Sequence, residues 1–480
     1  MNPDMPISAS MRGDSPYSIT RQIAKALTAH AGSGEQRGPR RVLLFTSSLG
    51  FGHLRAAQAI ELALKDRMPL IEVRTLDLWS LMDEKVALAI RTAYLRLVQE
   101  QPDLYDRVYR LDQRTWRAIL QDSKRLPPEI AEIMALIPVT LPNGKSARAG
   151  NLHAMDRILL VLLTTVLSAH PNNSLANSRL LRLALVQSAW ARLSRRFINV
   201  IQGFDPDVVI ATQMNPAALL SAARTRGCLD IPTIGVVTDY GVHDFWMQSG
   251  IDLYCLAHQS MAEPDTARIT ADKVVSTGIP LMPGFRQPPD VHEARRALGL
   301  ATDRPTVLVA GGGLGLGVDA VAERLLTRSG DSQLLINSGR NPTARRALAL
   351  LARRYPDRLR VWNWTEHMEQ LICAADVVIG KPGGLTVAET LACGRPLLAT
   401  HALQGQEGFN IRFLESHGAG RMVPEDQLVG ALDALFRDPL ALMRMKARAW
   451  SLGRRDGAAR IAALVERSTS WYPHLLAAGA

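Results

Sequence analysis

The stretch that decides the fold is residues 376–393, DVVIGKPGGLTVAETLAC. A short β-branched run ends there in the turn Lys381-Pro382-Gly383-Gly384, and helical spacing begins near Thr386. Comparable strand and turn segments begin at Arg41, Asp207, Thr233, Pro305 and Ser332. Short β-branched runs that alternate with helical segments are typical of parallel sheets covered by helices on both faces, so the sequence predicts an α/β fold.

The length of the chain and one proline- and glycine-rich segment predict two main domains. The 480 residues are enough for two or three domains. Residues 276–290, STGIPLMPGFRQPPD, contain four prolines and two glycines and are typical of an interdomain linker. The expected organisation is a flexible tail (1–40), a first domain (41–285), a second domain (286–440), and C-terminal helices (441–480) that pack back on the first domain.

Composition and charge narrow the class of protein. With 47% hydrophobic and 21% charged residues, the chain is typical of a globular protein. Its formal net charge is +11, and residues 107–196 contain 14 Lys and Arg against 5 Asp and Glu. Such a basic region suits nucleic acid, a membrane surface or an acidic small molecule. Nucleic acid is the weakest of these interpretations, because the region has no recognisable nucleic-acid-binding module and few aromatic residues.

The N-terminal residues and the cysteines indicate the compartment. Residues 1–40 lack the continuous apolar segment of a secretory signal, and the four cysteines form no CxxC pair, which favours a reduced cytoplasmic environment. The longest apolar run, residues 158–167, is shorter than the ~18–20 residues of a membrane-spanning helix. A helix packed on the sheet or a helix at a membrane surface would explain the apolar stripe of Leu183, Val186, Trp190, Leu193 and Phe197.

The turn before Thr386 predicts an anion site. Backbone N–H groups and the positive end of a helix attract phosphate, and Gly383 and Gly384 let a diphosphate approach the backbone. Glu389 follows about one turn into the helix, where its carboxylate could bind the two vicinal hydroxyls of a ribose. An ordinary strand-to-helix turn is the alternative interpretation.

Two other loops are candidates for the same ligand. Residues 310–317, AGGGLGLG, follow another strand, but no register fits the GxGxxG pattern of dinucleotide-binding proteins. A glycine loop around Gly313 that faces a diphosphate remains open. Gln406, Glu407 and Asn410 place amide and carboxylate groups together, which could bind the hydroxyls of a hexose or could be solvated loop residues.

Residues 47–53, SSLGFGH, place His53 at a helix start after the first strand. Ligands of open α/β sheets bind at this edge, and a helix N-terminus lowers the pKa of a histidine, so His53 could accept a proton. Asp239, His243 and Trp246 follow a third apolar strand and are expected at the same edge. Turn residues with no role in binding are the alternative for these three.

Asp205 and Asp207 are separated by one residue and so match a metal-binding DxD motif. Because the pair precedes a strand, we interpret it as a turn and expect no metal site.

Taken together, these motifs resemble the monogalactosyldiacylglycerol synthase and processive diacylglycerol glucosyltransferase family. A more distant resemblance is to the lipid-linked N-acetylglucosaminyltransferase of peptidoglycan synthesis. The shared pattern extends over about residues 41–423. It consists of GxGHxxAA (50–57), TD followed by HxxW (238–246), KPGGLTxAE (381–389) and GQExxN (405–410).

The resemblance implies a GT-B fold, in which two α/β domains face each other across a cleft. It implies inverting transfer of a hexose from a UDP-sugar to a lipid hydroxyl such as that of diacylglycerol, without a metal or other cofactor. His53 resembles the general base, and Asp239 belongs to the catalytic group. Acceptor-side residues would be Gly52, Tyr94, His243 and Trp246. Donor contacts would be Gly313, Trp364, Thr365, Met368, Lys381, Gly383, Gly384, Thr386, Glu389, Gln406, Glu407 and Asn410.

A lipid acceptor and the basic region together predict peripheral attachment to an anionic membrane surface on the cytoplasmic side. A UDP-sugar epimerase is one alternative, although such an enzyme would not need a basic and apolar face. A non-catalytic subunit that holds a UDP-sugar or a lipid is the other. The presence of His53, Asp239 and Glu389 argues against this second alternative.

Overall fold

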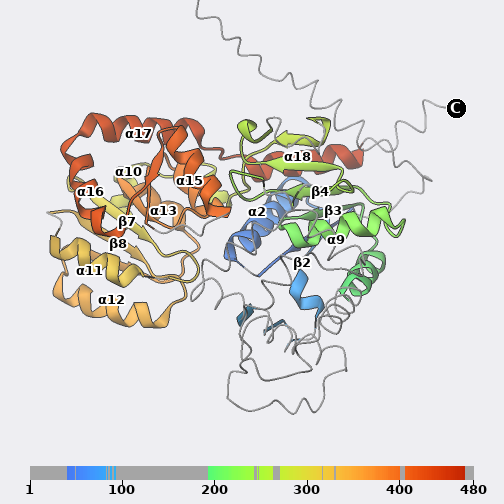
Figure 1. The fold of residues 1–480 in the computed structure, drawn as a ribbon, viewed down its shortest axis with the longest axis horizontal. Helices are drawn as coiled ribbons and strands as arrows, with labels where there is room; N and C mark the ends of the chain where they lie inside the picture. Colours follow the sequence, from blue (N-terminus) through green and yellow to red (C-terminus); the bar gives the residue numbers. More distant parts are fainter. Residues whose placement is uncertain are drawn as a thin grey trace, which may run out of the picture.

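Two parallel α/β domains lie side by side in the computed structural model, which confirms the predicted fold class (Figure 1). The structure describes residues 40–48, 50–82, 84, 87–88, 91–92, 193–242, 246, 248–262, 271–315, 317–328, 331–400 and 406–470. No helix within these ranges is long and apolar enough to cross a membrane.

The first sheet has the strand order β2-β1-β3-β4-β5-β6, and neighbouring strands are parallel. Its central strands are buried on both faces, which explains their continuous apolar sequences. The strands are β1 (Arg41–Thr46), β2 (Glu72–Asp77), β3 (Val208–Ala211), β4 (Thr233–Val236), β5 (Leu253–Leu256) and β6 (Val274–Ser276).

The second sheet is also parallel and has the order β12-β11-β10-β7-β8-β9. The strand order changes direction between β7 and β10, which is where open α/β sheets bind ligands. The strands are β7 (Thr306–Ala310), β8 (Gln333–Asn337), β9 (Leu359–Trp362), β10 (Val377–Gly380), β11 (Leu397–Ala399) and β12 (Gly420–Met422).

Parallel neighbours need crossover connections, and helices in these connections pack on the sheets. The first domain contains α2 (Phe51–Arg67), α9 (Met214–Thr225), and the 3-10 helices η2 (Leu78–Leu81), η4 (Gln259–Ala262) and η6 (Ala271–Lys273). The linker contains η7 (Pro283–Phe285). The second domain contains α10 (Val291–Ala297), α11 (Val318–Arg328), α12 (Pro342–Arg354), α13 (Met368–Ala374), α14 (Gly384–Ala392), α15 (Gln406–Ser416), η8 (Glu425–Gln427) and α16 (Leu428–Arg437).

The last two helices belong to different domains. Helix α17 (Pro439–Leu452) packs on α14 of the second domain, whereas α18 (Gly457–Ser470) packs on α2 of the first (Figure 1). Ile461 and Val465 of α18 are fully buried together with Val42 and Leu44 of β1. The chain therefore returns to the first domain between residues 452 and 457.

An apolar core also joins the two domains. Tyr240, Ile279 and Phe285 from the first domain and the linker are buried with Leu391 and Phe413 of the second. The rings of Tyr240 and Phe413 stack with their centroids 4.3 Å apart. This shared core fixes how the carboxyl edges of the two sheets face each other.

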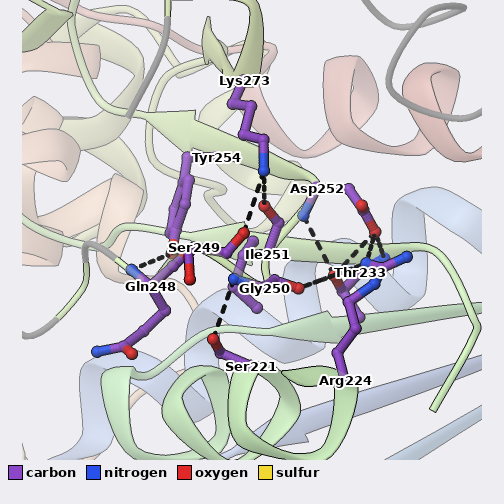
Figure 2. A network of polar contacts seen from close by, with 10 residues as sticks. All are labelled: Ser221, Arg224, Thr233, Gln248, Ser249, Gly250, Ile251, Asp252, Tyr254 and Lys273. Carbon is purple, nitrogen blue, oxygen red and sulfur yellow. Dashed lines mark hydrogen bonds and ion pairs between the residues drawn. The ribbon is translucent and has the colours of Figure 1, made fainter. Parts of the chain in front are cut away.

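A polar network at the amino ends of β4 and β5 secures the first domain (Figure 2). Asp252 Oδ2 accepts hydrogen bonds from the backbone N–H of Thr233 at 2.8 Å and from the Thr233 hydroxyl at 3.0 Å. The same carboxylate pairs with the guanidinium of Arg224 on α9. Both charged side chains are mostly buried, with 14% and 11% of their surface exposed, and Arg224 also donates to the Thr233 hydroxyl and the Gly250 carbonyl. Removing one charge of a buried ion pair is costly, so this network stabilises the first domain.

The loop before β5 is anchored by the same region of the sheet (Figure 2). The N–H of Gly250 donates to Ser221 Oγ at 3.0 Å, and Lys273 donates to two carbonyls of this loop. The Tyr254 hydroxyl donates to the carbonyl of Trp246. These contacts hold the far end of the segment that begins at Asp239.

We expect Asp252→Ala to lower the free energy of unfolding by about 3 kcal/mol, because the change removes the carboxylate that pairs with the buried Arg224 guanidinium and accepts from the buried Thr233 N–H. Urea unfolding monitored by circular dichroism measures the loss. Glu72→Ala is the matched control, since it removes an exposed carboxylate from Arg41 and should cost less than about 1 kcal/mol. Equal losses in the two variants would contradict this account of the network.

Candidate functional site

A cavity of about 300 Å³ lies between the carboxyl edges of the two sheets. The first domain lines it with the turn after β1, the start of α2 and the residues after β4. The second domain lines it with the turns after β7 and β10 and with α14. Helices α2 and α14 both begin at this cavity, so the positive ends of two helix dipoles face it.

His53 lies in the first turn of α2 with its ring orientation set by two neighbours. Nδ1 lies 3.0 Å from the carbonyl of Thr212 and 3.0 Å from the hydroxyl of Thr238. A carbonyl can only accept, so Nδ1 carries the proton and Nε2 is left as the nitrogen that can take up another. Burial lowers the pKa of His53 to about 4, against the opposing effect of the Thr212 carbonyl. The imidazole is therefore neutral at pH 7.

The start of α14 is an open anion site. Gly383 is the N-cap residue, and none of the described side chains caps the helix. The first N–H groups of α14 therefore remain available to a ligand in the cavity, which Thr386 also lines. Lys381 stands beside this turn, with its Nζ 3.6 Å from Oε1 of Glu407.

Glu389, in the second turn of α14, lines the same cavity. Burial raises the pKa of its carboxyl to about 7, opposed by Arg55 and reinforced by Glu369. A carboxyl whose pKa lies near 7 is easily shifted to its ionised form at neutral pH. Each unit of pKa corresponds to only ~1.4 kcal/mol, so a modest gain in hydrogen bonding to the carboxylate is enough. Ligand hydroxyls that donate to it would supply that gain.

Aromatic and charged side chains from both domains meet beside the cavity, which Phe51, Arg55 and Trp364 line. The ring centroids of Phe51 on α2 and Trp364 lie 5.5 Å apart, and the Arg340 guanidinium lies 4.9 Å and 4.7 Å from them. Phe51 fits there because Gly313 has no side chain: a Cβ on Gly313 would lie 1.9 Å from the Phe51 ring. Arg55 adds an ion pair across the cleft, with Nη1 2.5 Å from Glu366 Oε2.

Behind the cavity wall, a buried amide connects the domains. Asn410 Nδ2 donates to Asp239 Oδ1 at 3.0 Å and to the carbonyl of Pro382 at 2.9 Å. Its Oδ1 accepts from the N–H of Tyr240 at 2.7 Å. Asp239 lines the cavity, whereas Asn410 is fully buried.

Two family models match successive parts of the chain. Residues 176–281 match the family described as monogalactosyldiacylglycerol (MGDG) synthase, and residues 306–461 match the glycosyltransferase family 28 C-terminal domain. The matches together span more than half of the chain and include the residues after β4 and the turns after β7 and β10. The chain belongs to the MGDG synthase and glycosyltransferase family 28 group.

Individual relatives agree with this assignment. The processive diacylglycerol β-glucosyltransferase of Bacillus pumilus is 29% identical over 266 residues, which are 54% of this chain and 68% of that protein. MurG of Acinetobacter baumannii has a TM-score of 0.52 at 16% identity, and the match covers 89% of this chain and 100% of MurG. A putative UDP-N-acetylglucosamine 2-epimerase of Listeria monocytogenes also reaches 0.52, at 12% identity, with coverages of 91% and 98%. These two structural likenesses show the GT-B type of fold alone.

Most residues expected at the transferase site lie together. The cavity is lined by Gly52, His53, Asp239, Gly313, Trp364, Thr365, Met368, Lys381, Gly383, Gly384, Thr386, Glu389 and Glu407. Tyr94, His243 and the side chain of Gln406 lie outside the described residues.

Two expected contacts are placed differently. Trp246, expected on the acceptor side, is 4% exposed and packs in the apolar core of the first domain, because its indole fills space beside Phe197 and Tyr254. Asn410, expected to touch the hexose, is not among the described residues that line the cavity, since its amide is used between the domains.

Among the residues that sequence reasoning missed are Phe51, Arg55 and Thr238, which line the cavity, and Arg340, whose guanidinium contacts Phe51 and Trp364. Phe51 and Arg55 flank His53 on α2, and Thr238 immediately precedes Asp239. Proximity to a predicted site residue was the available signal for these three. Arg340 follows β8, far from any quoted motif. Its contact with Phe51 of the first domain depends on how the domains face each other.

We expect His53 to be neutral at pH 7 with the proton on Nδ1, and to titrate near pH 4. Nuclear magnetic resonance of the enzyme labelled with ¹⁵N-histidine reports both the tautomer and the midpoint. His53→Gln identifies the resonance by its disappearance. A midpoint near 6.5, or a proton on Nε2, would contradict the hydrogen-bond assignment to Thr212.

Proposed function

We propose that this glycosyltransferase moves a hexose from a UDP-sugar to the hydroxyl of a diacylglycerol-type lipid, with inversion at the anomeric carbon. The observation that carries the proposal is that His53, whose Nδ1 is bonded to the Thr212 carbonyl, lines the same cavity as the start of α14, which no described side chain caps. The relatives named for diacylglycerol glucosyl transfer support the lipid acceptor.

The second domain supplies the donor site in this proposal. The diphosphate binds the N–H groups at the start of α14, and Lys381 adds a positive charge beside it. Glu389 accepts the two ribose hydroxyls, and Trp364, Thr365 and Met368 surround the base. Gln406 and Glu407 bind hydroxyls of the hexose.

Transfer then follows as a single displacement. Nε2 of His53 takes the proton of the lipid hydroxyl while that oxygen bonds to the anomeric carbon, and the bond from this carbon to the diphosphate oxygen breaks. The negative charge that develops on UDP is stabilised by the N–H groups of α14, which are already oriented toward it. Asp239 lies beside this reaction path on the first-domain side of the cavity.

The low pKa of His53 suits this role because bound UDP brings negative charge into the cavity as the reaction proceeds. A base with a pKa near 4 is weak, but the imidazolium that forms during transfer would lie opposite the negative charge leaving on UDP. The opposite charge stabilises the protonated ring in the transition state. The base is therefore neutral before the reaction and strengthened during it.

We further propose that the enzyme meets its acceptor at an anionic membrane surface. The basic excess lies between residues 107 and 196, in the first domain that would face the acceptor. Each Lys or Arg near such a surface contributes ~1 kcal/mol, and the attraction fades within ~8–10 Å at moderate salt.

The test is lipid mass spectrometry after incubation with vesicles that contain diacylglycerol and a panel of UDP-sugars. We expect a hexosylated lipid with wild type, faster formation on anionic than on zwitterionic vesicles, and a loss of this advantage at high salt. His53→Ala should lower turnover ~10²–10⁴-fold while UDP affinity stays nearly unchanged.

Two controls separate the parts of this proposal. Arg192, Arg195 and Arg196 replaced together by Ala should weaken vesicle binding without changing UDP affinity. Conversion of a UDP-sugar to its epimer without lipid would favour an epimerase, and wild-type turnover by His53→Ala would exclude His53 as the base.

We expect the affinity for UDP-glucose to fall about tenfold between pH 8 and pH 6, because Glu389 must be ionised to accept the ribose hydroxyls and its pKa in the empty site is about 7. The diphosphate of UDP-glucose does not itself titrate in this range. Calorimetry measures the dissociation constants. Glu389→Gln should remove the pH dependence, and Glu389→Ala should cost ~1–3 kcal/mol of binding free energy at pH 8.

His53→Ala is the matched control and should keep the pH dependence, since His53 titrates well below this range. The same slope in Glu389→Gln as in wild type would show that another group carries the titration.

A further inference from the structure

Two hydrogen bonds of Asn410 hold a segment of the first domain against the second, and a third joins it to a turn of its own domain. Asn410 lies on α15 and is fully buried. It contacts the Asp239 carboxylate and the Tyr240 N–H on the first domain, and the Pro382 carbonyl in the turn before α14. One amide therefore joins the proposed donor turn to a residue on the opposite wall of the cavity.

The start of α14 approaches the same segment from the other side. A Cβ placed on Gly384 would lie 1.8 Å from the carbonyl oxygen of Thr238 and 2.8 Å from Asp239 Oδ1. Backbone meets backbone here, and only glycine leaves room for it. Asn410 and Gly384 together confine the three residues 238–240.

The confined segment also reaches His53. The Thr238 hydroxyl lies 3.0 Å from Nδ1 of His53, and Asp239 lines the cavity beside it. A shift of residues 238–240 would therefore move both groups that the reaction needs on the first-domain side. The second domain sets their position although it contributes neither of them.

We propose that Asn410 is a positioning residue that holds Asp239 directly, and His53 through Thr238, when the cleft is closed. This inference rests on the proposed function for its kinetic consequence. Because the partners of Asn410 belong to different domains, its bonds to Asp239 and Tyr240 exist only in the closed arrangement. Closure of the cleft and alignment of the reacting groups are therefore the same event.

The alternative is that Asn410 touches the donor hexose, as its place in the GQExxN motif first suggested. The two roles predict different defects. A donor contact changes the KM for UDP-sugar, whereas a positioning residue lowers kcat with little change in KM or in UDP affinity.

The first measurement compares Asn410→Leu with Gln333→Leu. Leucine has the branched shape of asparagine, although it is larger, and it cannot bond to Asp239 or Tyr240. We expect kcat to fall up to about 10²-fold, the size associated with small misplacement of reacting groups, with the KM for UDP-sugar within about twofold. Gln333 is the matched control because it too is a buried amide, but its bonds to Ala301 and Thr306 stay within the second domain. Gln333→Leu should leave the kcat unchanged.

The second measurement reports closure without needing transfer. Cys228 is exposed on the first domain, the other three cysteines are buried, and Leu350 on α12 is 67% exposed. Spin labels on Cys228 and on the cysteine of Leu350→Cys give the interdomain distance by double electron–electron resonance. We expect a single interdomain distance in the labelled Leu350→Cys protein. When Asn410→Leu is added, we expect a second population at a different distance. Gly384→Ala should produce the same change by a steric route, so the test stands even where Asn410→Leu does not fold.

The outcomes are distinguishable. If Asn410→Leu raises the KM or weakens UDP in proportion to its loss of turnover, and the distance distribution is unchanged, Asn410 is a donor contact and the inference is overturned. If the wild type transfers no hexose, the proposed function fails, and the distances still decide whether Asn410 closes the cleft. Unchanged distances in both Asn410→Leu and Gly384→Ala would overturn the inference whatever the activity.

Discussion

The close approach of α14 to the backbone of Thr238 is the constraint on which the rest of the site depends. At Gly384 the first turn of a helix in one domain meets a strand end of the other with no side chain between them. This contact keeps the start of α14, which no described side chain caps, at the same cavity as His53. A residue with a Cβ at this position would separate the two halves of the site.

The relative size of the interdomain forces shows what keeps this contact in place. The Arg55–Glu366 pair is partly exposed, with 61% of the Glu366 side chain accessible, so it contributes at most about 1 kcal/mol. The shared apolar core around Tyr240 and Phe413 buries several large side chains, each worth ~1.5–3 kcal/mol. Packing therefore holds the domains together, and the buried bonds of Asn410 specify their register.

Burial shifts two pKa values in opposite directions within this cavity. It lowers that of His53 and raises that of Glu389, because in each case it penalises the charged form. At pH 7 the His53 imidazole is therefore neutral, and the Glu389 carboxyl is near the midpoint of its titration. A ligand that brings its own charge and hydroxyl groups can reverse each penalty locally, so ionisation is coupled to binding. Local sequence contained part of this information, since His53 at a helix start was expected to be neutral, but the raised pKa of Glu389 follows from what surrounds it.

The amino-acid sequence by itself determined the strand-turn-helix units, the two-domain α/β fold, and the turns that carry His53, Gly383 and Glu389. These features depend on residues adjacent in the chain, such as glycines at turns and β-branched runs, so local rules suffice. Only the tertiary structure decided that Trp246 enters the core and that Asn410 bonds to Asp239 and does not line the cavity. It also decided that Arg340 contacts Phe51 and that Arg55 pairs with Glu366 between the domains. These positions depend on contacts between residues far apart in sequence, Asn410 and Asp239 being separated by 171 positions. No periodicity or motif encodes such a distance, because it is set by how two separately formed sheets pack against each other.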